Sequence, residues 1–136
     1  MKLFIICSKK FYERIPPIAA ELEAAGHALT MPNCYDNPGL EEEHRALGAK
    51  EHAAWKASMI AHSVDVIREN DGVLVLNFDK EGAANYIGGA TFLEMYDAFK
   101  LGKKIFLYNP IPEGMLRDEI LGFMPTVIEG DLSRVC

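Results

Sequence analysis

The sequence predicts an α/β fold: a three-layer sandwich in which helices cover both faces of a five-stranded, mostly parallel sheet. Short apolar runs alternate with segments of helical spacing, which is typical of parallel sheets. The runs 3–7 and 73–76 are apolar throughout, as expected for strands buried on both faces. Residues 71–109 also form one strand–helix–strand unit, and such units have right-handed crossovers. With 136 residues, the chain fits a single domain over 1–136, of the Rossmann-like (flavodoxin-like) kind.

The elements follow in order from these patterns. Strands are expected at 2–7, 27–31, 72–77, 103–108 and 126–128. Ser8 is suited to cap the first helix, whose apolar positions recur from Phe11 to Leu22. Pro16 and Pro17 are expected to kink this helix or to delay its start, because proline removes a helix hydrogen bond.

A long helical region is predicted from about Leu40 to Asn70, broken near Gly48, after the turn-rich segment 32–39. Its second half carries an apolar stripe made of Trp55, Met59, Ile60, Val64 and Ile67. The stripe predicts either packing on the sheet or a symmetric homodimer, and both interpretations stay open. Shorter helices are expected at 92–99 and at about 115–121.

Composition excludes some function classes. The formal net charge is −6 and no Lys- or Arg-rich run stands out, which argues against a nucleic-acid partner. No apolar run approaches the roughly 20 residues that span a bilayer, so no membrane partner is expected. The first strand is followed at once by Ser8, Lys9 and Lys10, unlike a signal peptide. Three cysteines without a C-x-x-C suit reduced thiols, and a cytoplasmic location is predicted.

Several common motifs are missing from the sequence. There is no G-x-G-x-x-G after the first strand, no G-x-x-x-x-G-K-[ST] and no G-x-S-x-G. The four histidines lack the i,i+4 spacing of a zinc site on one helix. We therefore expect no cofactor and no metal ion.

Polar and glycine residues follow the predicted strands at their carboxyl ends, where ligands bind in open parallel sheets. The candidates for ligand binding are Cys7, Ser8 and Lys9 after the first strand, Asn77 at the end of the third, and Gly88, Gly89 and Thr91 before the next helix. Ser8 and Lys9 suit a phosphate, although ordinary capping with a solvated lysine explains them too. Gly88 and Gly89 either bring backbone amides close to a ligand or merely allow a tight turn. Cys7 is interpreted as a small apolar residue rather than a nucleophile.

Two acidic residues are candidates for catalysis. Glu94 lies in the first turns of its helix, where a carboxylate could attack an electrophilic carbon or stabilise a cationic transition state. The alternative is structural, since Thr91 and Glu94 have the spacing of a capping box. Asp79 lies just beyond the third strand, where it could bind a base or sugar or act as a turn aspartate beside Lys80.

The stretch from Val64 to Leu107 resembles the nucleoside 2-deoxyribosyltransferase-like proteins, which include the deoxynucleoside 5′-monophosphate N-glycosidases. The similarity rests on an aspartate-ended pair before an apolar strand, a T-x-x-E motif and a helix ending in L-G-K, here Asn70-Asp71, the strand 72–77, Thr91 to Glu94, and Leu101-Gly102-Lys103. The resemblance implies that Glu94 is the nucleophile at the anomeric carbon. Asp79 is a candidate to replace the family's acid on the side of the base, although no family position implies that role. The resemblance also places Ser63 where the family has an aspartate, and Tyr96 where the family has a glycine.

Two hypotheses about function follow. The first is an N-glycosidase or deoxyribosyltransferase that acts on a nucleoside or nucleotide. The second is a non-catalytic module of the same fold that binds or senses a nucleotide, which the changes at Ser63 and Tyr96 favour. In both, the partner is a small nucleoside or nucleotide, and a homodimer or higher homo-oligomer is expected. An exposed Glu94 near a second carboxylate would favour catalysis, whereas a Glu94 bonded to the Thr91 amide and covered by Tyr96 would favour binding alone.

Overall fold

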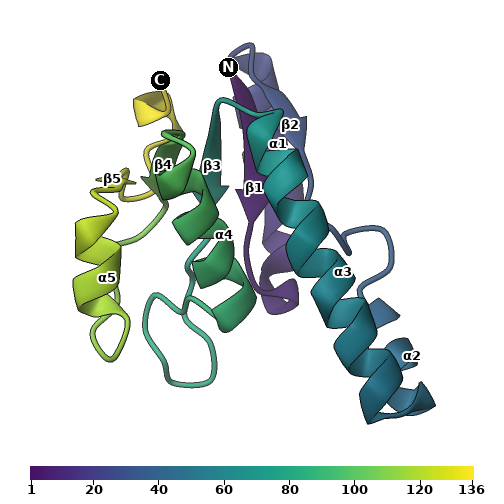
Figure 1. Ribbon diagram of the computed structural model, residues 1–136. Helices are drawn as coiled ribbons and strands as arrows, with labels where there is room; N and C mark the ends of the chain where they lie inside the picture. The colour runs from purple at the N-terminus through teal and green to yellow at the C-terminus, as the bar shows by residue number, and fades with distance from the viewer.

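A five-stranded sheet forms the middle layer of the computed structural model, which describes residues 1–136 (Figure 1). All neighbouring strands are parallel, in the order β2-β1-β3-β4-β5. The strands are β1 (Lys2–Ile6), β2 (Ala28–Thr30), β3 (Gly72–Val75), β4 (Lys104–Leu107) and β5 (Thr126–Val127). The predicted α/β sandwich is confirmed, and all five strands lie within the predicted segments.

The helices also follow the prediction, except that the first begins late, α4 begins three residues early, and a short 3-10 helix at 132–134 was not predicted. They are the 3-10 helix η1 (Lys9–Arg14), α1 (Ile15–Ala24), α2 (Leu40–Leu47), α3 (Ala49–Arg68), α4 (Gly89–Lys100), α5 (Arg117–Gly122) and the 3-10 helix η2 (Leu132–Arg134). Pro16 and Pro17 lie at the first positions of α1 and delay its start, because proline is tolerated there but not inside a helix. The predicted break near Gly48 separates α2 from α3. Gly48 has a φ of 131°, which favours glycine over any other residue.

Successive side chains along each strand point alternately to the two faces of the sheet, and each face has its own hydrophobic core. Leu3, Ile5 and Leu74 point to the face that α1 covers, where Ile15 and Leu22 meet them. Their neighbours along the strands point to the other face, under α3, α4 and α5: Phe4, Ile6, Val73 and Val75, packed with Ile67, Met95, Ala98 and Ile120. Burial on both faces explains why β1 and β3 are apolar without alternation.

Gly72 allows β3 and β4 to approach closely at their start. A Cβ atom at this position would lie 2.7 Å from the Lys104 carbonyl oxygen, closer than real contacts allow. Gly72 pairs with Lys104 in the register between the two strands. A side chain here would therefore push the two central strands apart.

The helical hairpin of α2 and α3 extends past the sheet. In Figure 1, α3 continues beyond the arrowheads of the strands, and α2 lies at its far end. Both chain ends lie at the opposite end of the molecule. None of the residues of α2 is buried. The hairpin therefore forms a side wall at the carboxyl edge of the sheet. None of the helices has the length and apolar character that crossing a membrane requires.

Candidate functional site

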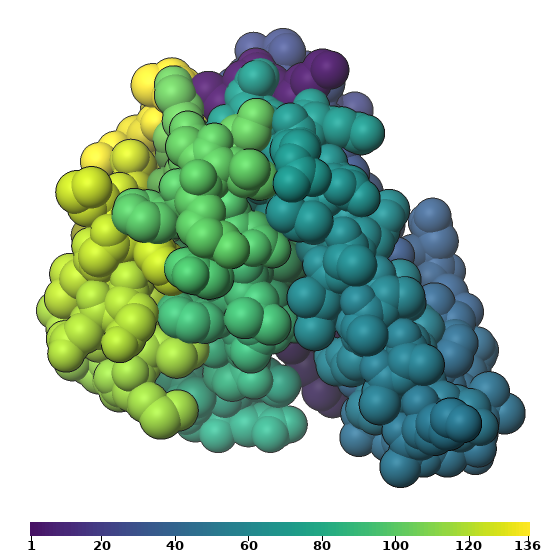
Figure 2. Space-filling view, viewed as in Figure 1, coloured from purple at the N-terminus to yellow at the C-terminus, as the bar shows by residue number.

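A pocket of about 360 Å³ opens at the carboxyl ends of β1, β2 and β3. This edge includes the point where the chain changes direction in the sheet, because β1 leads to β2 on one side and neighbours β3 on the other. In the space-filling view the surface is hollowed between α3 and the segment that contains α4 (Figure 2). The volume suits a small ligand of about the size of a nucleoside.

Among the carboxyl groups that line this pocket, Glu94 has the most strongly shifted pKa. Its side chain is partly buried on α4, and Ser63 of α3 donates a hydrogen bond to its Oε2 at 3.0 Å. Burial raises the pKa of Glu94 from 4.5 to about 7, because a charged carboxylate loses solvation there. The Ser63 hydrogen bond lowers this pKa, the negative charge of Asp97 raises it, and Lys56 lowers it. Glu94 therefore exchanges its proton near neutral pH, as general bases and nucleophiles of active sites often do.

The capping-box interpretation of Glu94 is wrong. The N-cap of α4 is Gly88, three residues earlier than the pattern predicted, so Thr91 lies inside the helix. Glu94 accepts its hydrogen bond from Ser63 instead of folding back onto the Thr91 amide.

Tyr96 does not cover Glu94 either. It is 45% exposed, and its ring lies 6.3 Å from that of Phe123 on the outer face of α4. Lys100 lies over the same ring at 4.3 Å. Two residues along a helix correspond to a turn of about 200°, so Tyr96 and Glu94 point to nearly opposite sides. Tyr96 therefore leaves the pocket unobstructed.

A short chain of hydrogen bonds fixes Glu94 from outside its own helix. Asn33, in the loop after β2, donates from Nδ2 to Ser63 Oγ at 2.8 Å, and Ser63 Oγ donates to Glu94 Oε2. Ser63 is only 5% exposed. The hydroxyl of this buried serine thus contacts the Glu94 carboxylate directly.

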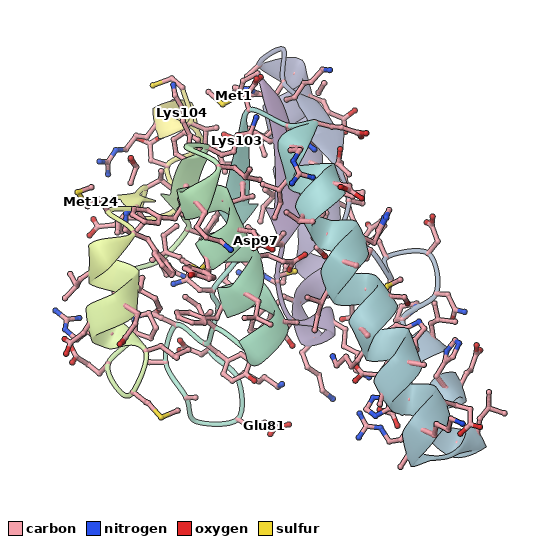
Figure 3. The ribbon with its side chains drawn as sticks, in the orientation of Figure 1. Met1, Glu81, Asp97, Lys103, Lys104 and Met124 are labelled. Atoms are coloured by element: carbon pink, nitrogen blue, oxygen red, sulfur yellow. The ribbon has the colours of Figure 1, made fainter.

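A second carboxylate lines the pocket one helical turn after Glu94. Asp97 lies on the side of α4 toward α3, where its side chain is 17% exposed (Figure 3). Lys100 approaches it to 3.6 Å. Because residues three apart on a helix are neighbours, Glu94 and Asp97 present two carboxyl groups to one cavity.

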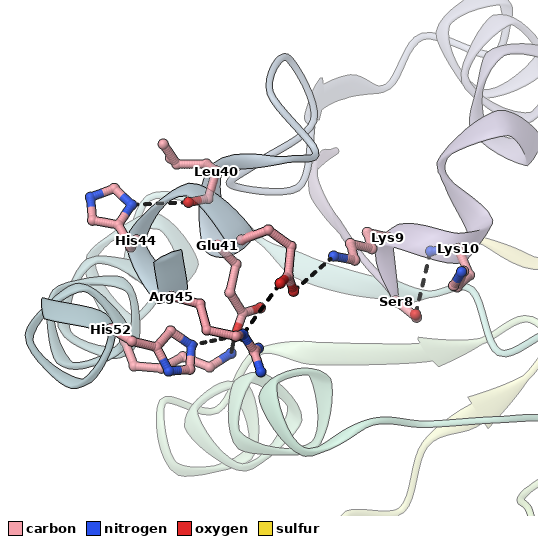
Figure 4. Close-up of polar contacts among 10 residues, drawn as sticks. Ser8, Lys9, Lys10, Leu40, Glu41, His44, Arg45 and His52 are labelled. Carbon is pink, nitrogen blue, oxygen red and sulfur yellow. Dashed lines mark hydrogen bonds and ion pairs between the residues drawn. The ribbon is translucent and has the colours of Figure 1, made fainter. Parts of the chain in front are cut away.

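The rim of the pocket is rich in charge. Glu41 on α2 accepts hydrogen bonds from His52 at 2.9 Å and lies 3.1 Å from the Lys56 ammonium (Figure 4). Lys9 reaches across from η1 to Glu42 of α2 at 3.8 Å. Burial raises the pKa of Glu41, but the hydrogen bonds from His52 and Lys56 lower this pKa by more, so the net shift is downward. These pairs hold α2 against α3 and leave lysine side chains beside the pocket.

Most of the residues predicted to bind a ligand line the pocket: Cys7, Ser8, Lys9, Gly88, Gly89 and Thr91. The Ser8 hydroxyl accepts from the Lys10 amide at 3.4 Å, so it also caps η1. Burial, helped by the charge of Glu94, raises the pKa of Cys7 to about 12. Cys7 therefore stays a neutral thiol at physiological pH, in agreement with its interpretation as a small apolar residue.

Asn77 and Asp79 lie elsewhere, and this corrects the prediction for both. Asn77 is fully buried, where it accepts from the Asn109 amide at 2.8 Å and donates to the carbonyls of Asn109 and Pro110. It joins the ends of β3 and β4 and does not line the pocket. Asp79 is exposed and accepts from the Asn85 amide at 3.0 Å, which closes the loop 79–85. Asp79 is therefore a turn aspartate, the alternative that its position beside Lys80 left open.

Sequence reasoning missed several polar residues of the pocket as site residues, among them Asn33, Lys56, Ser63 and Asp97. One signal was available for Ser63, which interrupts the apolar stripe of α3 between Met59 and Ile67 at helical spacing. A small polar residue in such a stripe indicates a hydrogen-bond partner across the helix interface. Asn33 carried no comparable signal, since asparagine in a turn-rich loop is ordinary.

The apolar stripe on α3 is divided between the core and the pocket. Ile67 is buried under the helix layer, whereas Trp55, Met59 and Ile60 line the pocket beyond the edge of the sheet. Trp55 also stacks on His44 of α2, with ring centroids 5.5 Å apart. The stripe thus forms the apolar wall of the site.

Comparison with known proteins found no protein-family model, no curated protein and no solved structure that matches this chain.

Proposed function

We propose that this protein cleaves or transfers at the N-glycosidic bond of a nucleoside, deoxynucleoside or 5′-monophosphate, with Glu94 as the nucleophile. The observation that carries the proposal is a partly buried glutamate whose pKa is raised to about 7, hydrogen-bonded by Ser63, inside a pocket large enough for a nucleoside. The resemblance to the nucleoside 2-deoxyribosyltransferase-like proteins places the nucleophile at the same residue.

The chemistry follows from one free carboxylate oxygen. Ser63 engages Oε2 of Glu94, so Oε1 is the oxygen that attacks the anomeric carbon. The new C–O ester bond forms as the C–N bond breaks, and the base leaves with the bonding electrons and takes up a proton. Water then attacks the anomeric carbon and passes its proton to the carboxylate that protonated the base, which releases the sugar and restores the Glu94 carboxylate. If a second base attacks instead of water, the reaction is a transfer.

Asp97 replaces Asp79 as the candidate carboxyl group on the side of the base, and in its protonated form it would give the departing base its proton. It lines the pocket beside Glu94, whereas Asp79 serves the loop 79–85. A 5′-phosphate would find the ammonium groups of Lys9 and Lys80 at the rim of the same pocket. Metal or cofactor chemistry is not part of the proposal.

The test is release of free base from a panel of deoxynucleosides, ribonucleosides and their 5′-monophosphates. The wild type is compared with Glu94→Gln, which keeps the side chain's shape, and with Glu23→Gln, a matched change at an exposed position of α1. We expect base release that falls at least about 100-fold in Glu94→Gln and is unchanged in Glu23→Gln. Absence of release from every substrate would contradict the enzyme proposal. A rise in melting temperature with nucleotides would then favour the sensing module.

We further propose that the chain forms a homodimer in the cytoplasm. All three cysteines are free, as expected in a reducing compartment. Large apolar side chains are exposed on the outer face of α4 and α5: Leu93, Tyr96, Phe99, Leu121 and Met124. A second copy would cover this surface. Light scattering of the wild type and of Phe99→Lys tests this point, since the variant is expected to shift the mass toward that of a monomer.

A further inference from the structure

We propose that Ser63 and Asn33 are positioning residues that hold the Glu94 carboxylate in its reactive orientation and favour its ionised form. The catalytic part of this inference rests on the proposed function, whereas the effect on the ionisation of Glu94 does not. Neither residue touches the reacting atoms in this scheme. Both act through the carboxylate.

Three separate elements supply the three residues. Asn33 belongs to the loop after β2, Ser63 to the middle of α3, and Glu94 to the second turn of α4. The distances are 2.8 Å from Asn33 Nδ2 to Ser63 Oγ and 3.0 Å from Ser63 Oγ to Glu94 Oε2. Both are good hydrogen-bond lengths, and Ser63 is almost fully shielded from water. In a shielded position a protein hydrogen bond meets little competition from solvent.

The direction of each hydrogen bond follows from the chemistry of the groups. A serine hydroxyl has one hydrogen, and an ionised carboxylate can only accept. Ser63 must therefore donate to Glu94, and the Asn33 Nδ2 group donates to one of the two lone pairs of the Ser63 oxygen. Because the Asn33 Nδ2 group is a donor and cannot accept the hydroxyl hydrogen, that hydrogen has one favourable direction, toward Glu94.

This arrangement has two consequences for Glu94. One carboxylate oxygen is fixed, which fixes the plane of the carboxylate and leaves Oε1 to face the pocket. A hydrogen bond to the charged form also favours ionisation, against the effect of burial. Two other charged groups act on Glu94, Lys56 on α3 and Asp97 on α4. Three further titratable groups face it, and the charge of Glu94 helps to raise their own pKa values: Cys7 after β1, Tyr12 in η1 and Cys34 after β2. The variants below leave all of these groups in place.

The first test removes the hydroxyl with Ser63→Ala, and its matched control is Ser58→Ala on the same helix. Ser58 is exposed, and its hydroxyl bonds only to the Trp55 carbonyl of its own turn. The readout is the titration of the Glu94 carboxyl carbon by ¹³C NMR, which needs no substrate. We expect Ser63→Ala to raise the apparent pKa of Glu94 by about one unit and Ser58→Ala to leave it unchanged. Ser63→Thr, which keeps a hydroxyl, is expected to restore the wild-type titration.

The second test changes the direction of the Ser63 hydroxyl with Asn33→Asp. The new carboxylate can only accept, so it draws the hydrogen of Ser63 away from Glu94, and the pKa of Glu94 rises. Asn37→Asp is the matched control, because it adds the same charge in the same loop but does not line the pocket. Asn33 is exposed, so this variant is expected to fold even if Ser63→Ala does not.

A kinetic measurement tests the catalytic part of the inference, that Ser63 and Asn33 hold Glu94 in its reactive orientation. With a substrate identified by base release, Ser63→Ala is expected to lower kcat about tenfold, with little change in KM, and to move the acidic limb of the pH profile upward. A merely structural role would lower the melting temperature without moving that limb. The inference is overturned if Glu94 titrates at its wild-type pKa in Ser63→Ala, or if Asn33→Asp and Asn37→Asp shift it equally. If the wild type releases no base, the proposed function fails, and the NMR titration still decides the role of Ser63 and Asn33.

Discussion

Replacing Glu94 by glutamine is expected to stabilise the folded protein at alkaline pH, although it removes the proposed nucleophile. Glu94 is partly buried and accepts one hydrogen bond, from Ser63, which compensates only part of the solvation that its charge loses. Glutamine has the same shape and can still accept from Ser63, but it carries no charge. Residues arranged for chemistry often reduce stability in this way.

The size of the effect follows from the pKa of Glu94, which burial raises from 4.5 to about 7. Between these two pH values the folded protein keeps a proton that the unfolded chain has lost, so stability of the wild type falls as pH rises. At about 1.4 kcal/mol for each pKa unit, the loss is complete above pH 7 and reaches at most about 3 kcal/mol. The side chain of the Glu94→Gln variant does not titrate, so the variant does not lose this stability as pH rises.

The assay is urea unfolding of the wild type and of Glu94→Gln at pH 5 and at pH 8.5, followed by circular dichroism. The variant is expected to gain up to about 3 kcal/mol over the wild type at pH 8.5 and less than about 1 kcal/mol at pH 5. Glu23→Gln, at an exposed position of α1, is expected to show no such difference between the two pH values. An equal effect of Glu94→Gln at both pH values would refute the argument that burial raises the pKa of Glu94.

Three further predictions follow from the structure. The rate of base release is expected to rise with pH up to about 7, because only the ionised form of Glu94 attacks, and a pH profile of kcat/KM measures this. Asn77→Leu is expected to destabilise the fold by about 3 kcal/mol, measured by urea unfolding, because it removes three hydrogen bonds of a fully buried side chain to the main chain of Asn109 and Pro110. Glu41→Gln is expected to speed amide hydrogen exchange in α2 without changing it in α4, since its carboxylate holds α2 to Lys56 and His52. Glu43→Gln removes a neighbouring charge that forms no ion pair and is expected to leave exchange in α2 unchanged. Unchanged exchange in Glu41→Gln would show that stacking of Trp55 on His44 holds α2 instead.

The sequence predicted the layers of the fold because the responsible signals are local. Continuous apolar runs identified β1 and β3 as strands buried on both faces, and Gly48 marked the break between α2 and α3. Pro16 and Pro17 predicted either a kink or a late start of α1, and the structure shows the late start. Each of these features depends on residues a few positions apart, which a single sequence reveals directly.

The carboxyl edge of the sheet was predicted for the same reason, since parallel strands all end on one side. Cys7, Ser8, Lys9, Gly88, Gly89 and Thr91 follow strands along the chain, and they line the pocket together with Glu94. Asn77 and Asp79 also follow a strand, yet they serve the main chain. Position after a strand brings a residue to the correct edge, but the direction of its side chain depends on the local path of the loop.

The environment of Glu94 was decided by tertiary structure alone. Whether Glu94 caps its own helix or faces a pocket depends on where α4 begins, and the structure places that start at Gly88. The contact with Ser63 depends on how α3 and α4 rotate about their axes when each buries its apolar side, and the contact with Asn33 depends on the loop after β2. Residues 33, 63 and 94 are about thirty positions apart from one to the next. Local periodicity determines which elements form, whereas the packing of those elements determines which of their polar side chains meet.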